Sequence, residues 1–275
     1  MPELPEVQTV VDTLQPLIIK QVIADVKIKN EKLIAKPKSN EFKKILRGSS
    51  IKKVSRRGKY IMIEFDNEYY LVTHLRMTGR FVYASQGDSG DKYDYIFLKF
   101  KNGDELRLGS KRKFTRTYLV KDLQEAGSLT KLGPEPLTAE FTVTRFEKMI
   151  SSRRGRIKPL LLNQRFLAGL GNIYVDESLY LAQIHPLRTA DTLTEREVEK
   201  LYRAIRKVLS EGIEQRGTTK WDYVDASGQA GNYQNYLRVY DREGEECRRC
   251  GSSLKRIKVG GRSSYFCPDC QQQEE

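Results

Sequence analysis

The stretch from residue 247 to residue 270, CRRCGSSLKRIKVGGRSSYFCPDC, decides how the C-terminal part of the chain folds. It holds two Cys-x-x-Cys pairs separated by sixteen residues, and these four cysteines are all that the chain contains. This spacing is typical of a four-thiolate zinc site. Disulfide bonds are the alternative, but a cytosolic protein keeps its thiols reduced. Because four thiolates leave no open coordination position, the sequence predicts one structural zinc held by Cys247, Cys250, Cys267 and Cys270.

The residues between the two cysteine pairs favour a β-hairpin. Residues 254–259 (LKRIKV) and 262–266 (RSSYF) read as two short strands, and Gly260-Gly261 between them suits a tight turn. The hairpin is basic, with cations at Lys255, Arg256, Lys258 and Arg262. We therefore predict a zinc-finger β-hairpin over residues 237–275, with a surface suited to a DNA groove.

Upstream of the zinc finger, the hydrophobic periodicity changes twice. Residues 5–18 repeat apolar positions at helical spacing, with Pro5 in the first turn. From about residue 51 to 120 the period is two, in seven short segments rich in β-branched and aromatic residues. Asn102-Gly103 and, more weakly, Asp66-Asn67 predict hairpin turns. The pattern predicts an α+β protein whose N-terminal part is an antiparallel sandwich or barrel flanked by helices.

A Gly-Pro-Glu-Pro sequence at residues 133–136 ends the strand pattern and predicts a domain boundary. Residues 138–216 read as helical, and Thr194 to Glu197 form a capping box. Residues 217–236 lack periodicity, and so long a loop is usually functional or disordered. We divide the chain into residues 1–133, 134–236 and 237–275.

The charge of the chain points to a polyanionic partner. Lys and Arg number 49 against 36 Asp and Glu, which gives a net charge of +13 and a pI near 9.5. A generally solvated basic surface is the alternative. Clustering argues against it, because the cations gather around residues 111–116, 153–158 and 255–262. The chain has no membrane-spanning segment and no signal segment, so we expect a cytoplasmic, nucleoid-associated protein.

Two short motifs have functional and structural interpretations. Residues 168–174 (AGLGNIY) place two glycines before a helix, an arrangement that suits a phosphate but also an ordinary turn between helices. The histidines, His74 and His185, read as structural. Residues 1–7 (MPELPEV) are an ordinary frayed end unless Met1 is removed. In that case the amine of Pro2, with an α-amino pKa near 7.7–8.0, becomes a nucleophile beside the proton-transferring carboxyl of Glu3.

Four segments together carry a resemblance to a known family. They are PELPEV at residues 2–7, HLRM at 74–77, GLGNIYVDE at 169–177 and the two terminal cysteine pairs. The chain resembles formamidopyrimidine-DNA glycosylase from end to end. The related endonuclease VIII branch typically has Gly where this chain has Leu4. The resemblance implies a β-sandwich domain, a helix–two-turns–helix domain and a zinc finger.

The implied activity is that of a bifunctional glycosylase and abasic-site lyase of base excision repair. It implies a monomer that removes 8-oxoguanine and formamidopyrimidines from duplex DNA, acts on abasic sites, and cleaves by β,δ-elimination. The alternatives are an endonuclease VIII-like enzyme for oxidised pyrimidines, a catalytically silent binder of damaged DNA, and a zinc-ribbon adaptor.

The resemblance also assigns roles to residues. Pro2 is the nucleophile, Glu3 the proton shuttle, Glu6 a support, and Lys59 a catalytic contact to phosphate. The expected DNA contacts are His74, Met77, Arg112, Phe114, Lys158, Asn172 and Arg262, of which Met77, Arg112 and Phe114 fill the gap left by an extruded base. Thr218, Thr219 and Tyr233 are expected on a lesion-capping loop.

The chain departs from the family pattern at one place. Residues 110–115 read SKRKFT, where the family usually has Asp-Pro-Arg-Arg/Lys-Phe-Gly. Arg112 and Phe114 are retained, but the acidic residue and the proline that orient the arginine are missing. We therefore expect altered discrimination of the base opposite the lesion, with Lys111 strengthening nonspecific binding.

Overall fold

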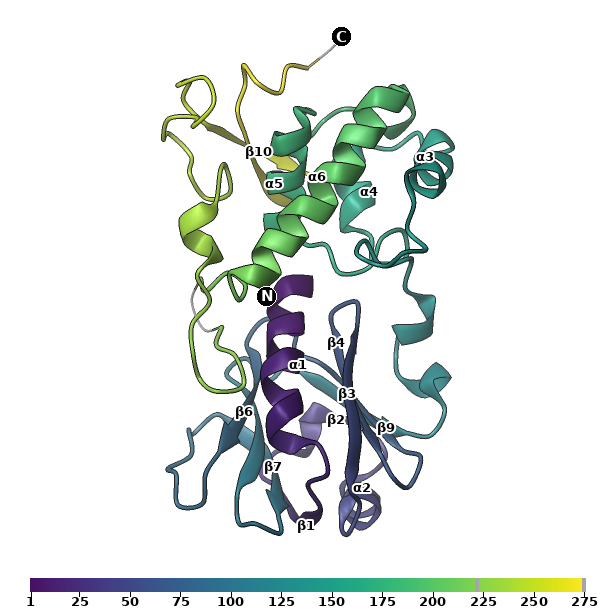
Figure 1. Cartoon of the computed structure of the whole chain (residues 1–275), viewed down its shortest axis with the longest axis vertical. Helices are drawn as coiled ribbons and strands as arrows, with labels where there is room; N and C mark the ends of the chain where they lie inside the picture. Colours follow the sequence, from purple (N-terminus) through teal and green to yellow (C-terminus); the bar gives the residue numbers. More distant parts are fainter. Residues whose placement is uncertain (221–222, 274–275) are drawn as a thin grey trace. The chain divides into compact units, whose positions relative to one another are not determined.

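The computed structural model describes residues 1–220 and 223–273, which divide into two compact units (Figure 1). Unit 1 contains residues 1–131 and 215–234, and unit 2 contains residues 132–214 and 235–275. Among the described residues, no helix has the length and apolar character needed to cross a membrane.

Two sheets form most of unit 1. The four-stranded sheet has the order β1 (Ile23–Ile28), β7 (Asp94–Phe100), β8 (Glu105–Ser110) and β6 (Gly79–Ala84). The five-stranded sheet has the order β2 (Ile34–Lys36), β9 (Arg116–Val120), β5 (Tyr70–His74), β4 (Tyr60–Phe65) and β3 (Ile51–Arg57). Their strands pair antiparallel, except that β2 and β9 run parallel.

Helices complete unit 1. They are α1 (Leu4–Ile18), α2 (Ser39–Leu46) and the short 3₁₀ helices η1 (Glu31–Leu33), η2 (Leu123–Glu125) and η3 (Leu129–Lys131). The structure confirms the predicted N-terminal helix, whose apolar positions at helical spacing are buried. It also confirms the seven strands predicted between residues 51 and 120.

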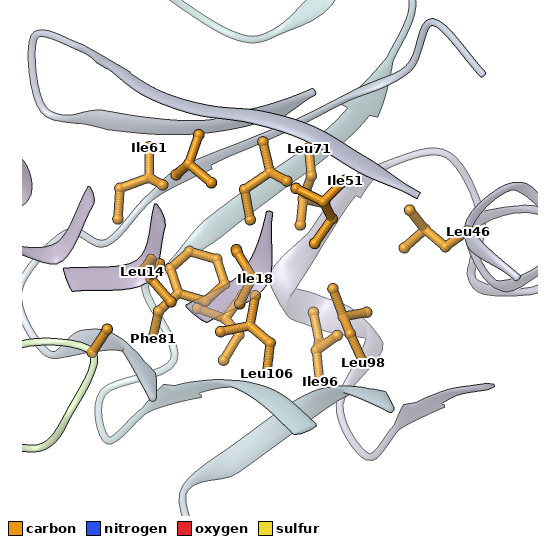
Figure 2. Close-up of a cluster of buried hydrophobic side chains, with 14 of the residues drawn as sticks. Leu14, Ile18, Leu46, Ile51, Ile61, Leu71, Phe81, Ile96, Leu98 and Leu106 are labelled. Atoms are coloured by element: carbon orange, nitrogen blue, oxygen red, sulfur yellow. The ribbon is translucent and has the colours of Figure 1, made fainter. Parts of the chain in front are cut away.

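The core of unit 1 lies between the two sheets, with one face of α1 in it (Figure 2). Leu14 and Ile18 of α1 lie between Ile61 on β4 and Leu106 on β8. Each fully buried leucine or isoleucine stabilises the fold by roughly 1.5–3 kcal/mol relative to an exposed one. The amphipathic helix therefore joins the sheets, and its first turn is held firmly at the edge of this core.

Two features of unit 1 differ from the sequence prediction. The elements β1, β2 and α2 were not predicted, because each is short and its apolar residues follow no clear period among the charged ones. Residues 215–234 belong to unit 1, whereas the sequence places them with the preceding helices. Hydrogen bonds from Tyr83 N to the Ala226 carbonyl (2.9 Å) and from Ala226 N to Thr13 Oγ1 (3.2 Å) account for this return.

Unit 2 contains the helices predicted over residues 138–216, followed by the predicted hairpin. The elements are α3 (Val143–Ser151), α4 (Ile157–Leu162), α5 (Asn172–Ala182), η4 (Ala190–Thr192), α6 (Glu195–Glu214), β10 (Lys255–Val259) and β11 (Arg262–Phe266), with η5 (Tyr233–Tyr236) at the change between units. The capping box before α6 is present, since Thr194 N donates to Glu197 Oε2 (2.8 Å) and Glu197 N to Thr194 Oγ1 (3.3 Å).

Candidate active site and DNA-binding residues

The first turn of α1 holds Pro2 and Glu3 in a buried position. Glu3 is the N-cap residue, and Glu3 and Glu6 form a reciprocal capping box in which Glu3 N donates to Glu6 Oε2 (2.8 Å). Pro5 fits the first turn because its nitrogen has no hydrogen to donate. These contacts fix the backbone that carries the candidate nucleophile and the candidate proton shuttle.

Glu6 also connects this turn to the loop over residues 215–234. Its second carboxylate oxygen accepts a hydrogen bond from Thr218 N (2.7 Å), and its carbonyl accepts one from the Tyr223 hydroxyl (3.2 Å). Gly217, with φ of +78°, makes this approach possible, because an added Cβ would lie 2.8 Å from Glu6 Cγ. Burial, together with the charge of Glu6, raises the pKa of the Tyr223 hydroxyl. Glu6 thus bonds the first turn of α1 to this loop, and its supporting role in the reaction stays a prediction.

The candidate lesion-loop residues hold the loop itself together in this structure. Thr219 Oγ1 donates to the Tyr223 carbonyl (3.0 Å) and accepts from Gly231 N (2.7 Å). Tyr233 is completely buried, and its backbone N donates to the Gly217 carbonyl (3.0 Å). Contacts of Thr218, Thr219 and Tyr233 with a lesion stay a prediction. Residues 221–222 of the same predicted loop lie outside the described residues.

Lys59 occupies the tight turn between β3 and β4. Gly58, with φ of +57°, is the first central residue of this two-residue turn, as a type II′ hairpin requires. Arg56 anchors the turn, because its guanidinium donates to the Gly58 carbonyl (2.9 Å) and to Gln8 Oε1 on α1 (2.9 Å). Lys59 is only 4% exposed. Lys59 lies on a hairpin that is bound to the same helix as Glu3.

His74 is a neutral hydrogen-bond donor rather than a cation. Burial, with the nearby charges of Arg76 and Lys59, lowers the pKa of its imidazole to about 3. Its Nδ1 accepts a hydrogen bond from Arg76 N (3.0 Å), so the ring hydrogen lies on Nε2. The ring packs edge-on against Tyr60, with centroids 4.7 Å apart. The residue combines the structural role read from sequence with a donor that suits a phosphate oxygen.

The structure brings Met77, Arg112 and Phe114 together on the surface of unit 1. The Arg112 guanidinium lies 5.3 Å from the centre of the Phe114 ring, and its Nη1 lies 3.1 Å from Met77 Sδ. Met77 and Phe114 are 45% and 51% exposed, although both are apolar. An exposed apolar pair around a planar cation is suited to insertion between unstacked bases.

We call Met77, Arg112 and Phe114 the wedge. Buried residues beneath it, which the sequence analysis did not single out, hold its loops together. Thr115 Oγ1 lies 2.9 Å from Ser110 Oγ and 3.1 Å from the Leu75 carbonyl, and both hydroxyl residues are buried. An added Cβ at Gly79 would lie 2.3 Å from the Leu75 carbonyl oxygen. Ser110 and Thr115 stand where the family pattern has Asp and Gly. Two hydroxyl residues at these positions were the sequence signal that could have predicted their contact.

In unit 2, Asn172 meets the strand that carries Arg262. Asn172 begins α5, and its Nδ2 donates to the carbonyl of Ser263, the residue that follows Arg262 (2.9 Å). Arg262 is exposed at the hairpin turn, where Gly260 and Gly261 both have positive φ, as predicted for this turn. The two expected phosphate contacts therefore lie on neighbouring segments of one unit.

Lys158 is a correction to the expected DNA contacts. Its side chain is completely buried, and its Nζ donates to Asp176 Oδ1 (2.6 Å) and to the Ser263 carbonyl (2.7 Å). A buried ammonium in this position does not reach a phosphate from the surface. The prediction was wrong because Lys158 belongs in sequence to the basic cluster at residues 153–158 but lies on the inner face of α4.

Two further residues of unit 2 fix its backbone segments and were not singled out from sequence. Gln164 accepts from Gly169 N (2.9 Å) and donates to the Leu170 carbonyl (2.7 Å), which fixes the glycine turn before Asn172. Glu177 is fully buried and accepts from three successive backbone N–H groups at residues 238–240. Glu177 is the last residue of the GLGNIYVDE motif, and this position was the sequence signal that could have indicated its importance.

The four cysteines form a site that fits one structural zinc. Their sulfur atoms all lie within 4.8 Å of one another, and three of the Sγ–Sγ separations are 3.4, 3.5 and 3.9 Å. A tetrahedron with Zn–S bonds of about 2.3 Å has sulfurs about 3.8 Å apart. The Tyr180 hydroxyl lies 3.4 Å from Cys247 Sγ and supports that ligand. The donor set and its spacing confirm the prediction of zinc.

Comparison with known proteins agrees with this arrangement. Residues 1–117 match the model of the formamidopyrimidine-DNA glycosylase N-terminal domain, residues 132–222 its H2TH domain, and residues 244–273 the zinc finger found in FPG and IleRS. The formamidopyrimidine-DNA glycosylase of Pelotomaculum thermopropionicum is 49% identical, over 98% of this chain and 99% of its own length. That of Desulforamulus reducens is 44% identical, over the same share of each chain.

The chain belongs to the formamidopyrimidine-DNA glycosylase family. Solved structures of Lactococcus lactis Fpg agree with this assignment. The complex with DNA containing N7-benzyl-Fapy-dG has a TM-score of 0.91, with 38% identity over 99% of this chain and 100% of that one. The complex with DNA containing an abasic site also has a TM-score of 0.91, with 38% identity over 98% and 100%. The chain is therefore a DNA glycosylase of base excision repair.

Proposed function

We propose that the protein removes oxidised purines, 8-oxoguanine and formamidopyrimidines, from duplex DNA and then cleaves the strand as a lyase. The observation that carries this proposal is the buried first turn of α1, where Glu6 binds both Glu3 N and Thr218 N. A frayed terminus has no need of such contacts. They hold Pro2 and Glu3 in one geometry, which an attacking amine and its proton-transfer partner require.

In the proposed reaction, removal of Met1 leaves the Pro2 nitrogen as the terminal secondary amine. Its lone pair attacks C1′ of the damaged nucleotide and a C1′–N bond forms, while the base leaves with the electrons of the glycosidic bond and takes up the proton that the Pro2 nitrogen loses. Glu3 donates a proton to the sugar ring oxygen as the ring opens and the iminium forms. The iminium acidifies C2′, and loss of the C2′ proton expels the 3′ phosphate. A second elimination expels the 5′ phosphate.

The other named residues act on the DNA in this proposal. Lys59 and the neutral His74 donate hydrogen bonds to phosphate oxygens near the lesion. Met77, Arg112 and Phe114 fill the gap that the extruded base leaves. Asn172 and Arg262 contact phosphates, and the loop over residues 217–236 covers the lesion. We further propose that the protein works as a monomer in the cytoplasm.

Excision assays on four duplexes test the substrate assignment. The duplexes carry 8-oxoguanine opposite cytosine, a formamidopyrimidine opposite cytosine, dihydrothymine opposite adenine, or an abasic site. We expect rapid cleavage of the two purine lesions and of the abasic site, with phosphate at both ends of the gap. Glu3→Gln, which keeps the size of the side chain but removes its acid function, is expected to bind the same duplexes and to lose base excision.

Faster cleavage of dihydrothymine than of either purine lesion would assign the protein to oxidised pyrimidines. Binding without cleavage of any duplex would contradict the enzymatic proposal and would favour a silent binder of damaged DNA.

A further inference from the structure

Three aromatic residues, Tyr93, Tyr95 and Phe97, lie on strand β7 of the four-stranded sheet or just before it. Side chains alternate along a strand. Ile96 and Leu98 enter the core of unit 1, so Phe97 between them lies on the opposite face. Tyr95 is partly buried beside the core, at a shift in the strand register, and Tyr93 lies just before the strand.

Each of these rings carries a lysine ammonium. Lys92 and Lys111 lie 5.1 and 6.0 Å from the centre of the Tyr93 ring, Lys113 lies 5.5 Å from that of Tyr95, and Lys29 lies 4.7 Å from that of Phe97. All four lysines are exposed. We call these four lysines and three rings the lysine–aromatic track. A ring under an ammonium restricts a flexible side chain and keeps its charge at a defined place on the surface.

The charges around the track favour an external anion. The acidic side chains at this edge of the sheet, Asp91 and Asp94, are both bound by Arg80, at 2.8 and 3.0 Å. That pairing offsets one of the two negative charges next to Lys92 and Lys111, and the four lysines outnumber the charge that remains. The positive charge of the track therefore dominates the local field, which is the condition for attracting a polyanion.

The track is continuous with the wedge formed by Met77, Arg112 and Phe114. Lys111 and Lys113 flank Arg112 in sequence, and the Lys113 N–H donates to the Ser110 carbonyl (3.1 Å) in a tight turn. The turn projects these two lysines from the same loop as the wedge. Lys111 stands where the family usually has proline, so this part of the surface is a feature of this chain.

We propose that the lysine–aromatic track binds the phosphate backbone of the duplex as an extension of the wedge. The proposal rests on the proposed function, because it takes the wedge as the point where the protein enters DNA. The lysines displace condensed counterions from the phosphates they contact, so their contribution depends on salt and is independent of the base sequence. Such contacts hold the duplex without reading the base opposite the lesion.

The test compares the salt dependence of DNA binding in three proteins. The duplex carries a tetrahydrofuran abasic-site analogue, and the dissociation constant is measured between 50 and 200 mM salt. The track variant is Lys111→Gln with Lys113→Gln. The matched control is Lys44→Gln with Lys53→Gln, which removes the same charge from exposed lysines on α2 and β3 of the same unit.

We expect the track variant to have a slope of log affinity against log salt that is shallower than wild type by about 1.8, because each phosphate contact contributes about 0.9. Over this fourfold change in salt, the track variant then loses about 12-fold less affinity than wild type. The control variant is expected to keep the wild-type slope. A track variant with the wild-type slope would overturn the proposal, as would an equal fall in both variants, which indicates a general charge effect.

Neutral linkages locate the contacts independently. Methylphosphonates are placed in the duplex one linkage at a time, and each is expected to weaken wild-type binding where a lysine of the track touches it. At the linkages that Lys111 or Lys113 contacts, the track variant should show no further loss, and if every linkage weakened both proteins equally, the contacts of these two lysines would be contradicted. A wild-type protein that fails to bind the duplex contradicts the proposed function itself, so the two failures are distinct.

Discussion

The buried pair of Lys158 and Asp176 offers a sharp test of how unit 2 holds its hairpin. Neither side chain is more than 1% exposed, and their charged atoms are 2.6 Å apart. Lys158 also donates to the Ser263 carbonyl, and Asp176 Oδ2 accepts from Tyr265 N (3.1 Å). Lys158→Met keeps the shape of the stem but leaves a buried carboxylate without its cation. Breaking such a pair costs about 3–5 kcal/mol.

The cost of Lys158→Met should depend on pH. Burial raises the pKa of Asp176 to about 7, although Lys158 opposes that rise. Removing Lys158 removes the opposition, so the pKa of Asp176 rises further above the unfolded value near 3.9. The unfolded chain ionises this carboxyl near pH 3.9, whereas the folded chain ionises it only near pH 7 or above. The free energy of unfolding therefore falls as pH rises between these two pKa values. The variant should therefore lose up to about 1.4 kcal/mol of stability per pH unit between pH 6 and 8.

The assay is hydrogen exchange of the β10 and β11 amides, with zinc present, at pH 6 and pH 8. Protection factors correct for the intrinsic pH dependence of exchange, and they report the opening free energy of the hairpin. The control is Lys158→Met with Asp176→Asn, in which no carboxyl group remains to titrate. We expect the single variant to lose protection between pH 6 and 8 and the double variant to lose less. Parallel pH profiles for the two variants would refute the reasoning.

Three further predictions follow from unit 1 and the zinc site. Gly217→Ala should cost about 2–3 kcal/mol in urea unfolding, from the contact with Glu6 and the positive φ, whereas Gly228→Ala, with the same φ of +78° and open space, should cost only about 1 kcal/mol. Because the pKa of His74 is lowered in the fold, its own contribution to the free energy of unfolding should fall by about 1–2 kcal/mol between pH 7 and 5, while the raised pKa of Asp176 acts in the opposite direction. The difference between wild type and His74→Gln isolates the His74 contribution, and parallel profiles of the two proteins would contradict it. Chelation of zinc should unfold the β10–β11 hairpin, seen as lost amide protection, and added zinc should restore it.

Local sequence signals predicted the local structures of this protein well. Apolar residues at helical spacing predicted α1, alternation predicted the strands, and Gly260-Gly261 predicted the hairpin turn. Each of these signals acts within a few residues, and so does the cysteine spacing that predicted the zinc site. The N-terminal Pro-Glu pair was also recognisable, because its proposed chemistry depends on residue types at one end of the chain.

The remaining features depend on contacts between distant segments. Lys158 belongs to a basic cluster in sequence, and only its burial against Asp176 and Ser263 separates it from the exposed cations. The return of residues 215–234 to unit 1 rests on hydrogen bonds to Glu6, Thr13 and Tyr83 that have no local signature. The lysine–aromatic track joins Lys29 to β7 in the same way.

The central claim is that the Pro2 nitrogen is the nucleophile, and covalent trapping tests it most directly. The protein is incubated with a duplex that carries one 8-oxoguanine opposite cytosine, in the presence of borohydride, and the adduct is mapped by mass spectrometry. Borohydride reduces the iminium to a stable amine, so we predict a cross-link at Pro2 in a chain that lacks Met1. A cross-link at a lysine such as Lys59, or efficient cleavage without any trapped adduct, would contradict the account.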